Sequence, residues 1–355
     1  MTNMSKELLL HIGTTKTGSS FLQSCAALNQ AFLRSRGIDY PPMGVEEAFF
    51  ANARKGIVTG GNGAVITQYV SANSEENLQR ILLESSSRLN CVDDTNRTLV
   101  SNEGLCNNVF AHIQRLKLLT DCARNAGYSH IKCLLVVRNP YEHMCSWFLE
   151  GLKGTGWAAF TSIEDYAVKY NDLPAIASAI TNAKELDIEL KCINYSTCKN
   201  ELLPLFLEWA GVSKADSISV ATPAKPVNRS LDCVEQIICQ ALAEHGIKPA
   251  LFAGKLLNSE LVSGNEAMNN IRSSIPYVAP AALDAMESIN LANVEFINLH
   301  LQESNHIKFN RGYFPSNDAD NLTITKMQLR SIVSTFAALL EQHTTSKPWK
   351  IVDKS

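Results

Sequence analysis

A run of small and hydroxyl-bearing residues, Gly13 to Ser20, could hold a phosphate group. It reads Gly-Thr-Thr-Lys-Thr-Gly-Ser-Ser and directly follows the apolar run 7–12. Two glycines at GxxxxG spacing between a strand and a helix are typical of a phosphate-binding loop, whose backbone N–H groups converge on an anion. The helix N-terminus adds partial positive charge, and the hydroxyls of Ser19 and Ser20 add donors. The alternative is a Gly/Ser/Thr-rich turn that only caps a helix.

The loop departs from the GxxxxGK[ST] pattern of nucleoside-triphosphate sites. Ser19 follows the second glycine, and the lysine lies inside the loop, at position 16. An ATP-dependent kinase would place a lysine after Gly18 to reach the outer phosphates, with magnesium on the next hydroxyl. The position of Lys16 therefore argues against a small-molecule kinase, which stays the alternative function.

A second set of candidate anion ligands follows the clearest buried strand, residues 131–138. Arg138 ends this strand, Pro140 sets a turn, and Ser146 lies about two turns into the next helix. A guanidinium offers a planar fork of donors that suits phosphate, and a serine hydroxyl adds a further bond. An arginine after a strand is, taken alone, more often part of a structural ion pair. Two anion sites on neighbouring strands suggest a nucleotide with phosphates at both ends of its ribose.

Alternating strands and helices must position these residues. Apolar runs predict strands at 7–12, 98–101, 131–138 and 188–194. Helical periodicity predicts helices at 19–36, 75–89, 110–127, about 199–210, 230–245, 280–303 and 325–342, with loop and short helices at 38–73. This order implies an α/β fold: a parallel β-sheet flanked by helices on both faces, with a helical C-terminal part, and ligands beyond the carboxyl ends of the strands. We expect one domain, 1–355, with a sheet core at about 6–215 and a helical subregion at about 228–345.

The composition excludes several classes of protein. Lys and Arg total 32 and Asp and Glu total 35, a net charge of −3, so a basic surface for coating nucleic acid is absent. A hydrophobic content of 45% excludes disorder. No apolar stretch suits a signal peptide or a membrane span, and the ten cysteines show no CxxC spacing. We therefore expect a cytoplasmic protein with reduced thiols and without a metal, nucleic-acid or membrane partner, and nothing supports a homo-oligomer.

Two runs, LLLHIGTTKTGSSFLQ and LLVVRNPYEHMCSWF, resemble the sulfotransferases that use 3′-phosphoadenosine 5′-phosphosulfate (PAPS). The 5′-phosphosulfate loop of that family has a Lys-Thr-Gly-Thr/Ser-Thr/Ser core after a strand. Its 3′-phosphate site is an arginine after a later strand plus a serine in the following helix. A weaker likeness covers Ile193–Tyr195 and Asn228–Leu231. The resemblance implies a fold related to P-loop nucleotide kinases and a reaction that needs no metal.

The resemblance also implies the cofactor-binding residues. Those for the 5′-phosphate are Thr15, Lys16, Thr17, Gly18, Ser19 and Ser20. Arg138 and Ser146 would hold the 3′-phosphate, Tyr195 is a candidate adenine contact, and Arg229 is a further phosphate contact. Lys16 would neutralise the charge that grows on the leaving phosphate oxygen, and the product would be 3′,5′-adenosine bisphosphate.

The acceptor must lose a proton, and two residues are candidates for the base. Glu103 follows the strand 98–101 in an SxE arrangement similar to that of carboxylate-based members of the family. A capping or salt-bridged glutamate is the alternative. His11 ends the first strand and is the rival base, although a histidine there is more often a packed core group. His143, near Arg138 in sequence, is expected to face solvent.

We therefore expect a sulfotransferase that moves a sulfuryl group from PAPS to a hydroxyl or amine of a small-molecule acceptor. A specialised metabolite, such as a toxin-type alkaloid, fits better than a polymer, because the sequence has no Lys/Arg-rich run for a polysaccharide groove. A carbohydrate sulfotransferase and a catalytically silent nucleotide-binding protein stay open as alternatives. The glycine-containing stretch 150–161 could form a lid over the acceptor.

Overall fold

The structure is a computed structural model, and it describes residues 5–57, 59–89, 95–217, 219–224, 231, 233–258, 275–315, 329–330 and 332–337. The chain divides into two compact units. The first comprises residues 1–144, 169–228 and 284–311, and the second comprises 145–168, 229–283 and 312–355. The sheet lies in the first unit, and the described elements of the second unit are helices.

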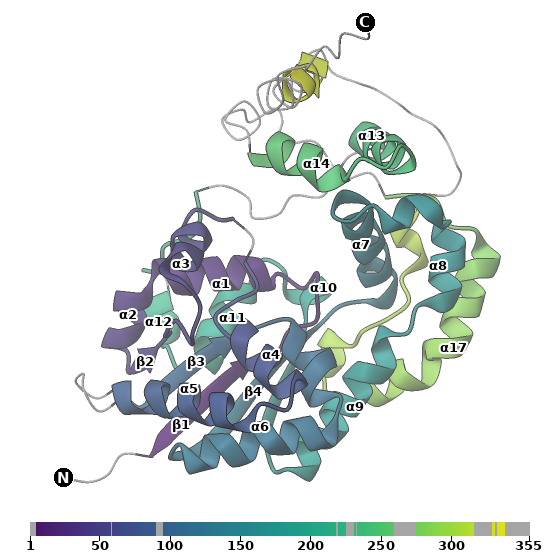
Figure 1. Cartoon of the computed structure of the whole chain (residues 1–355). Helices are drawn as coiled ribbons and strands as arrows, with labels where there is room; N and C mark the ends of the chain where they lie inside the picture. The colour runs from purple at the N-terminus through teal and green to yellow at the C-terminus, as the bar shows by residue number, and fades with distance from the viewer. Residues whose placement is uncertain are drawn as a thin grey trace, which may run out of the picture. The chain divides into compact units, whose positions relative to one another are not determined.

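Five parallel strands form the sheet of the first unit (Figure 1). They are β1 (Lys6–His11), β2 (Ile38–Asp39), β3 (Arg97–Ser101), β4 (Tyr128–Val137) and β5 (Glu189–Asn194), in the order β2-β3-β1-β4-β5. The chain builds β2 and β3 on one side of β1 and then crosses to the other side for β4. The carboxyl ends beside β1 are therefore the switch point at which ligands bind in such sheets.

Helices cover both faces of the sheet, which confirms the expected fold class. On one face, α1 (Ser19–Leu28), α2 (Gln30–Ser35), α3 (Glu47–Arg54) and α11 (Leu202–Trp209) share a core with β1, β3, β4 and β5. On the other face, α6 (Ile113–Asn125) contacts β4, α9 (Asp172–Glu185) contacts β5, and α5 (Glu75–Arg88) packs on α6. Because both faces are covered, β1 carries an unbroken apolar run, Leu8–Leu10, whose residues are at most 1% exposed.

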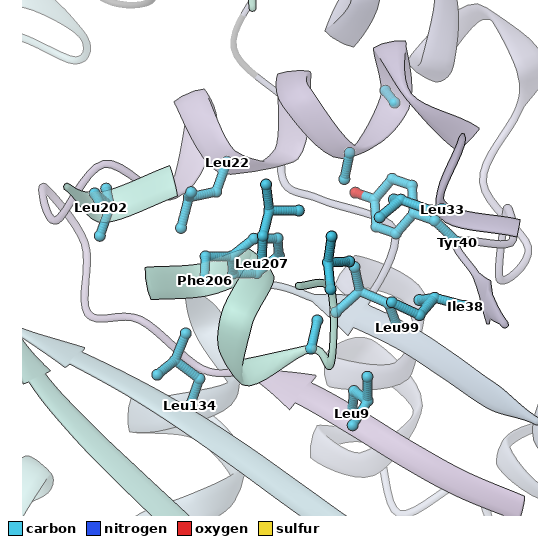
Figure 2. Packing of buried hydrophobic residues seen from close by; sticks show 14 of the residues in the cluster. Leu9, Leu22, Leu33, Ile38, Tyr40, Leu99, Leu134, Leu202, Phe206 and Leu207 are labelled. Atoms are coloured by element: carbon cyan, nitrogen blue, oxygen red, sulfur yellow. The ribbon is translucent and has the colours of Figure 1, made fainter. Parts of the chain in front are cut away.

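A buried core packs α1 and α11 against β1, just before the loop begins. Leu22 of α1, Phe206 of α11 and Leu9 of β1 belong to one buried cluster (Figure 2). Side chains alternate between the faces of a strand, so His11 belongs to the same face as Leu9. The imidazole of His11 meets the ring of Phe206 edge to face, with 5.5 Å between the centroids.

Two predicted helices are divided in the structure, and a third is preceded by a separate short helix. The stretch 19–36 forms α1 and α2, because Asn29 leaves helical geometry and its side-chain amide donates to the Cys25 carbonyl. The stretch 110–127 begins earlier, as a π-helix at Cys106–Phe110, and resumes as α6 after a non-helical residue, His112. The stretch 199–210 forms α11, preceded by the short helix α10 (Tyr195–Cys198).

The remaining elements include helices that the periodicity did not predict, and most of the predicted helix 325–342 lies outside the described residues. In the first unit the remaining elements are α4 (Ala64–Ser71), α12 (Lys214–Ser217) and a 3-10 turn at Glu303–Asn305. The second unit contains α13 (Cys233–Glu244), α14 (Pro249–Asn258) and a 3-10 turn at Trp157–Phe160. Three helices, α7 (Pro140–Lys153), α8 (Ile163–Lys169) and α17 (Pro280–Asn298), and a 3-10 turn at Arg311–Tyr313 include residues of both units. None of the described helices is long and apolar enough to cross a membrane.

The end of β3 is fastened by Asn62, which lies in the GGNG run 60–63. Its side-chain nitrogen donates to the carbonyls of Pro41 and Leu99, both at 2.9 Å, and its side-chain oxygen accepts the amide of Ser101 at 2.8 Å. Asn62 is 0% exposed. This side chain therefore fixes the strand end from which Glu103 follows.

Replacement of Asn62 tests that role. Asn62→Ala leaves buried carbonyls and an amide without their side-chain partner, so the free energy of unfolding should fall by about 2–4 kcal/mol in urea denaturation. The control is Asn77→Ala, because Asn77 is exposed and its side chain donates to Ser74. That change should stay within about 0.5 kcal/mol. Equal effects of the two substitutions would contradict the role of Asn62.

Candidate functional site

The loop between β1 and α1 lies at the carboxyl end of the central strand. Thr14 continues the pairing with β4, since its amide donates to the carbonyl of Val136 at 3.1 Å. The chain then turns through two left-handed residues, Lys16 with φ 63° and Gly18 with φ 85°. The hydroxyl of Thr17 donates to the Thr14 carbonyl at 2.5 Å and closes the turn. The result is the tight strand-loop-helix connection that the sequence predicts.

Neither glycine of the loop has room for a side chain. At Gly18 a Cβ atom would lie 2.6 Å from Leu202 and 2.9 Å from the ring of Tyr195. At Gly13 a Cβ atom would lie 2.8 Å from Oγ of Ser19 and 2.9 Å from Nε2 of His11. The GxxxxG spacing therefore reflects two close approaches of side chains to the loop backbone.

The two polar atoms beside Gly13 have no hydrogen-bond partner within the described part of the chain. They are Oγ of Ser19 and Nε2 of His11, in residues that are 1% and 0% exposed. A buried polar atom left unsatisfied costs about 1–3 kcal/mol, so such atoms are uncommon away from ligand or water sites. The unpartnered hydroxyl of Ser19, at the first residue of α1, fits an anion held at the helix N-terminus.

His11 is enclosed beneath the loop. Its Nδ1 lies 2.8 Å from the hydroxyl of Ser101, which also accepts a hydrogen bond from the side-chain amide of Gln23 at 3.2 Å. Burial lowers the pKa of His11 to about 4, so the ring is neutral at pH 7. His11 thus has the surroundings of a packed core histidine, the alternative that the sequence left open.

Arg138 and His143 contact two backbone carbonyls of the loop from one side, which we call its outer side. Nη1 of Arg138 donates to the Lys16 carbonyl at 3.0 Å, and Nε2 of His143 contacts the Thr15 carbonyl at 2.9 Å. In a trans peptide the carbonyl and the next N–H point in opposite directions. The N–H groups of Lys16 and Thr17 are therefore directed away from these two side chains, as an anion-binding loop requires.

Arg138 belongs to a polar network as well as to the loop. Its Nε lies 3.4 Å from Oε2 of Glu142, and its guanidinium carbon lies 5.3 Å from the centroid of the Tyr195 ring. Ser196 and Asn139 donate to the two carboxylate oxygens of Glu142, at 3.0 Å and 3.1 Å. The ion pair that sequence alone favours for such an arginine is present, and neither it nor the loop bond uses Nη2 of Arg138.

The structure places the other candidates as follows. Glu103 is half-buried just past β3, and the preceding amide, of Asn102, donates to the His11 carbonyl at 3.2 Å. The ring of Tyr195 lies against Gly18 and beneath Arg138, beside the loop. Ser20 is half-buried in the first turn of α1, Ser146 lies on α7 in the second unit, and Arg229 lies outside the described residues.

The expectation that His143 faces solvent is wrong, since the residue is 2% exposed. Its ring lies between the Thr15 carbonyl and the hydroxyl of Tyr170, which is 2.8 Å from Nδ1. Burial, together with the charges of Arg138 and Lys16, lowers the pKa of His143 to about 4, against an opposing effect of the Thr15 bond. No sequence pattern indicated Tyr170, because only the tertiary fold brings it to α7.

Comparison with known proteins identifies no family for this chain. No protein-family model matches the sequence, and no curated protein matches it. Among solved structures, a sulfotransferase domain from the curacin biosynthetic pathway is similar over 81% of this chain and 97% of its own, with 12% sequence identity and a TM-score of 0.33. At this TM-score the two structures are only loosely alike. No group of three or more metal-binding side chains occurs among the described residues.

The two buried neutral histidines make stability depend on pH. In the unfolded chain each titrates near 6.5, whereas in the folded protein the pKa is about 4. Their stabilisation is therefore complete above pH 6.5 and is lost as the pH falls towards 4, by roughly 3 kcal/mol for each histidine. The free energy of unfolding, measured in urea between pH 7 and pH 5, should fall less steeply in a His11→Gln, His143→Gln double variant than in the wild type. The exposed His130→Gln variant should keep the wild-type slope, and equal slopes in all three proteins would contradict the assignment.

Proposed function

We propose that this chain is a sulfotransferase that transfers a sulfuryl group from PAPS to a hydroxyl or amine of a small-molecule acceptor. The observation that carries the proposal is the loop at the carboxyl end of β1, with its lysine inside the loop rather than after Gly18. A kinase loop would need a cation at position 19, where this chain has a buried serine. The acceptor that we propose is a specialised metabolite.

The residues of the loop suit an anionic nucleotide. The carbonyls of Thr15 and Lys16 are held on the outer side, which favours amide donors within the loop, and Ser19 adds an unpartnered hydroxyl. We assign the 5′-phosphate to residues 15–20. PAPS, when bound there, supplies a sulfuryl group activated as an anhydride of that phosphate.

The 3′-phosphate is assigned to Arg138, with Ser146 and Arg229 as further ligands proposed from the sequence alone. Arg138 is partly buried, and a phosphate would engage its guanidinium through Nη2 in addition to the bonds already made. Tyr195, whose ring lies between the loop and Arg138, is the proposed adenine contact.

Lys16 is assigned the stabilisation of the leaving group, and Glu103 is assigned the role of general base. By analogy with phosphoryl transfer, negative charge grows on the leaving oxygen in a loose transition state, and the Lys16 ammonium group would stabilise it. Glu103 would accept the proton of the acceptor group, since it follows a strand that ends at the same edge of the sheet as β1. His11 is less suitable, because its ring is enclosed beneath the loop.

Nucleotide selectivity tests the proposed function. Addition of 3′,5′-adenosine bisphosphate without magnesium should raise Tm by several degrees, since a ligand at a hundred times its Kd stabilises by about 2.7 kcal/mol. ATP with magnesium should have little effect. Stabilisation by ATP and magnesium alone would overturn the proposal in favour of a kinase.

Substitution of the two candidate bases tests the proton transfer. A panel of small acceptors incubated with PAPS, and read by the added sulfonate mass, first identifies a substrate. Glu103→Gln should then lower kcat by about 100-fold or more and leave the Kd for 3′,5′-adenosine bisphosphate unchanged. His11→Asn is the comparison, and its kcat should fall less. Near-normal kcat in Glu103→Gln with intact nucleotide binding would exclude Glu103 as the base.

A further inference from the structure

We propose that Tyr170 and His143 form a positioning chain that sets the orientation of the loop amides and thereby the affinity of the loop for an anion. Neither residue is assigned a contact with the nucleotide. The inference rests on the proposed function of the loop, and it extends that function to a hydrogen-bonded chain on the outer side of the loop.

The hydrogen bonds fix the tautomer of His143. Nε2 faces the Thr15 carbonyl at 2.9 Å, and a carbonyl can only accept, so Nε2 carries the proton. Nδ1 of the neutral ring is then an acceptor, and the Tyr170 hydroxyl at 2.8 Å donates to it. Tyr170 is itself anchored, because its carbonyl accepts the side-chain amide of Asn290 at 3.2 Å.

The groups around the ring favour this neutral form. His143 is buried, and the positive charges of Arg138 and Lys16 act on it. A carboxylate oxygen of Asp172 lies 3.5 Å from Nδ1 and, when ionised, acts in the opposite sense, whereas burial raises the pKa of this carboxyl group. An imidazolium would carry a proton on Nδ1, and the Tyr170 hydroxyl would then lose its acceptor.

The positioning chain matters because it holds the peptide group between Thr15 and Lys16. With the Thr15 carbonyl bound to His143, the N–H of Lys16 must point to the opposite side. Arg138 fixes the next peptide in the same manner, through the Lys16 carbonyl. Lys16 has φ 63°, a conformation that costs a residue other than glycine about 1–2 kcal/mol, so the loop needs such restraint. Without the bond to His143 the peptide can rotate, and a carbonyl oxygen would then repel the anion.

Three variants separate positioning from packing. His143→Gln places an amide N–H near the position of Nε2, His143→Ala removes the donor, and Tyr170→Phe retains the ring but removes its hydroxyl. The exposed residue His130 gives the matched control, His130→Gln. The probes are 3′,5′-adenosine bisphosphate and inorganic pyrophosphate, with Kd measured by calorimetry. We expect about a tenfold or greater rise in Kd for His143→Ala, a rise of less than about threefold for His143→Gln, and an intermediate value for Tyr170→Phe.

A spectroscopic measurement on the ligand-free protein completes the test. Nitrogen-15 spectra of the imidazole should show the Nε2–H tautomer of His143 in the wild type and a mixture of tautomers in Tyr170→Phe. An Nδ1–H tautomer in the wild type, or equal loss of affinity in His143→Gln and His143→Ala, would overturn the positioning chain. If the wild type binds neither probe, the proposed function fails and the effect on affinity fails with it, whereas the tautomer spectra still decide whether Tyr170 orients His143. Tyr170→Phe keeps the test valid if His143→Ala does not fold.

Discussion

The site depends on one constraint: the backbone between Gly13 and Gly18 must present N–H groups rather than carbonyl oxygens at the end of β1. A single peptide turned the other way would place a partial negative charge where we propose that an anion binds. The strand end, the left-handed Lys16 and the hydrogen bonds from Arg138 and from His143 of α7 all act on the orientation of these peptides. The surrounding fold can be understood as the support for that short stretch of backbone.

The same constraint would allow a slightly acidic chain to hold the highly charged nucleotide that we propose. The net charge is −3, and the charges that the site needs are local ones, from Lys16, Arg138 and the N-terminus of α1. Arg138 is partly neutralised by Glu142, which is itself held by Ser196 and Asn139. Its role in the ligand-free protein is therefore to hold the loop as well as to offer charge. A diffuse basic surface is not required for a pocket of this kind.

The sequence predicted the parts of this structure that depend on local pattern. The buried strands are short apolar runs, and the GxxxxG spacing together with Arg138 after a strand indicated the sheet edge at which the candidate site lies. The break at Asn29 and the π-helix at Cys106–Phe110 were missed, because they follow from specific hydrogen bonds and not from periodicity. The burial of His143 was missed because the docking of α7 decides which of its faces is covered. The expectation of a single domain and the assignments of Ser146 and Arg229 stay predictions.

Amide spectra of the nitrogen-15-labelled protein, titrated with 3′,5′-adenosine bisphosphate in the absence of magnesium, test the central claim most directly. We predict that the largest shift changes fall on the backbone amides of residues 14–20 and on Arg138, saturating together at one Kd. Shift changes confined to other parts of the chain, or changes at the loop that appear only with ATP and magnesium, would contradict the account.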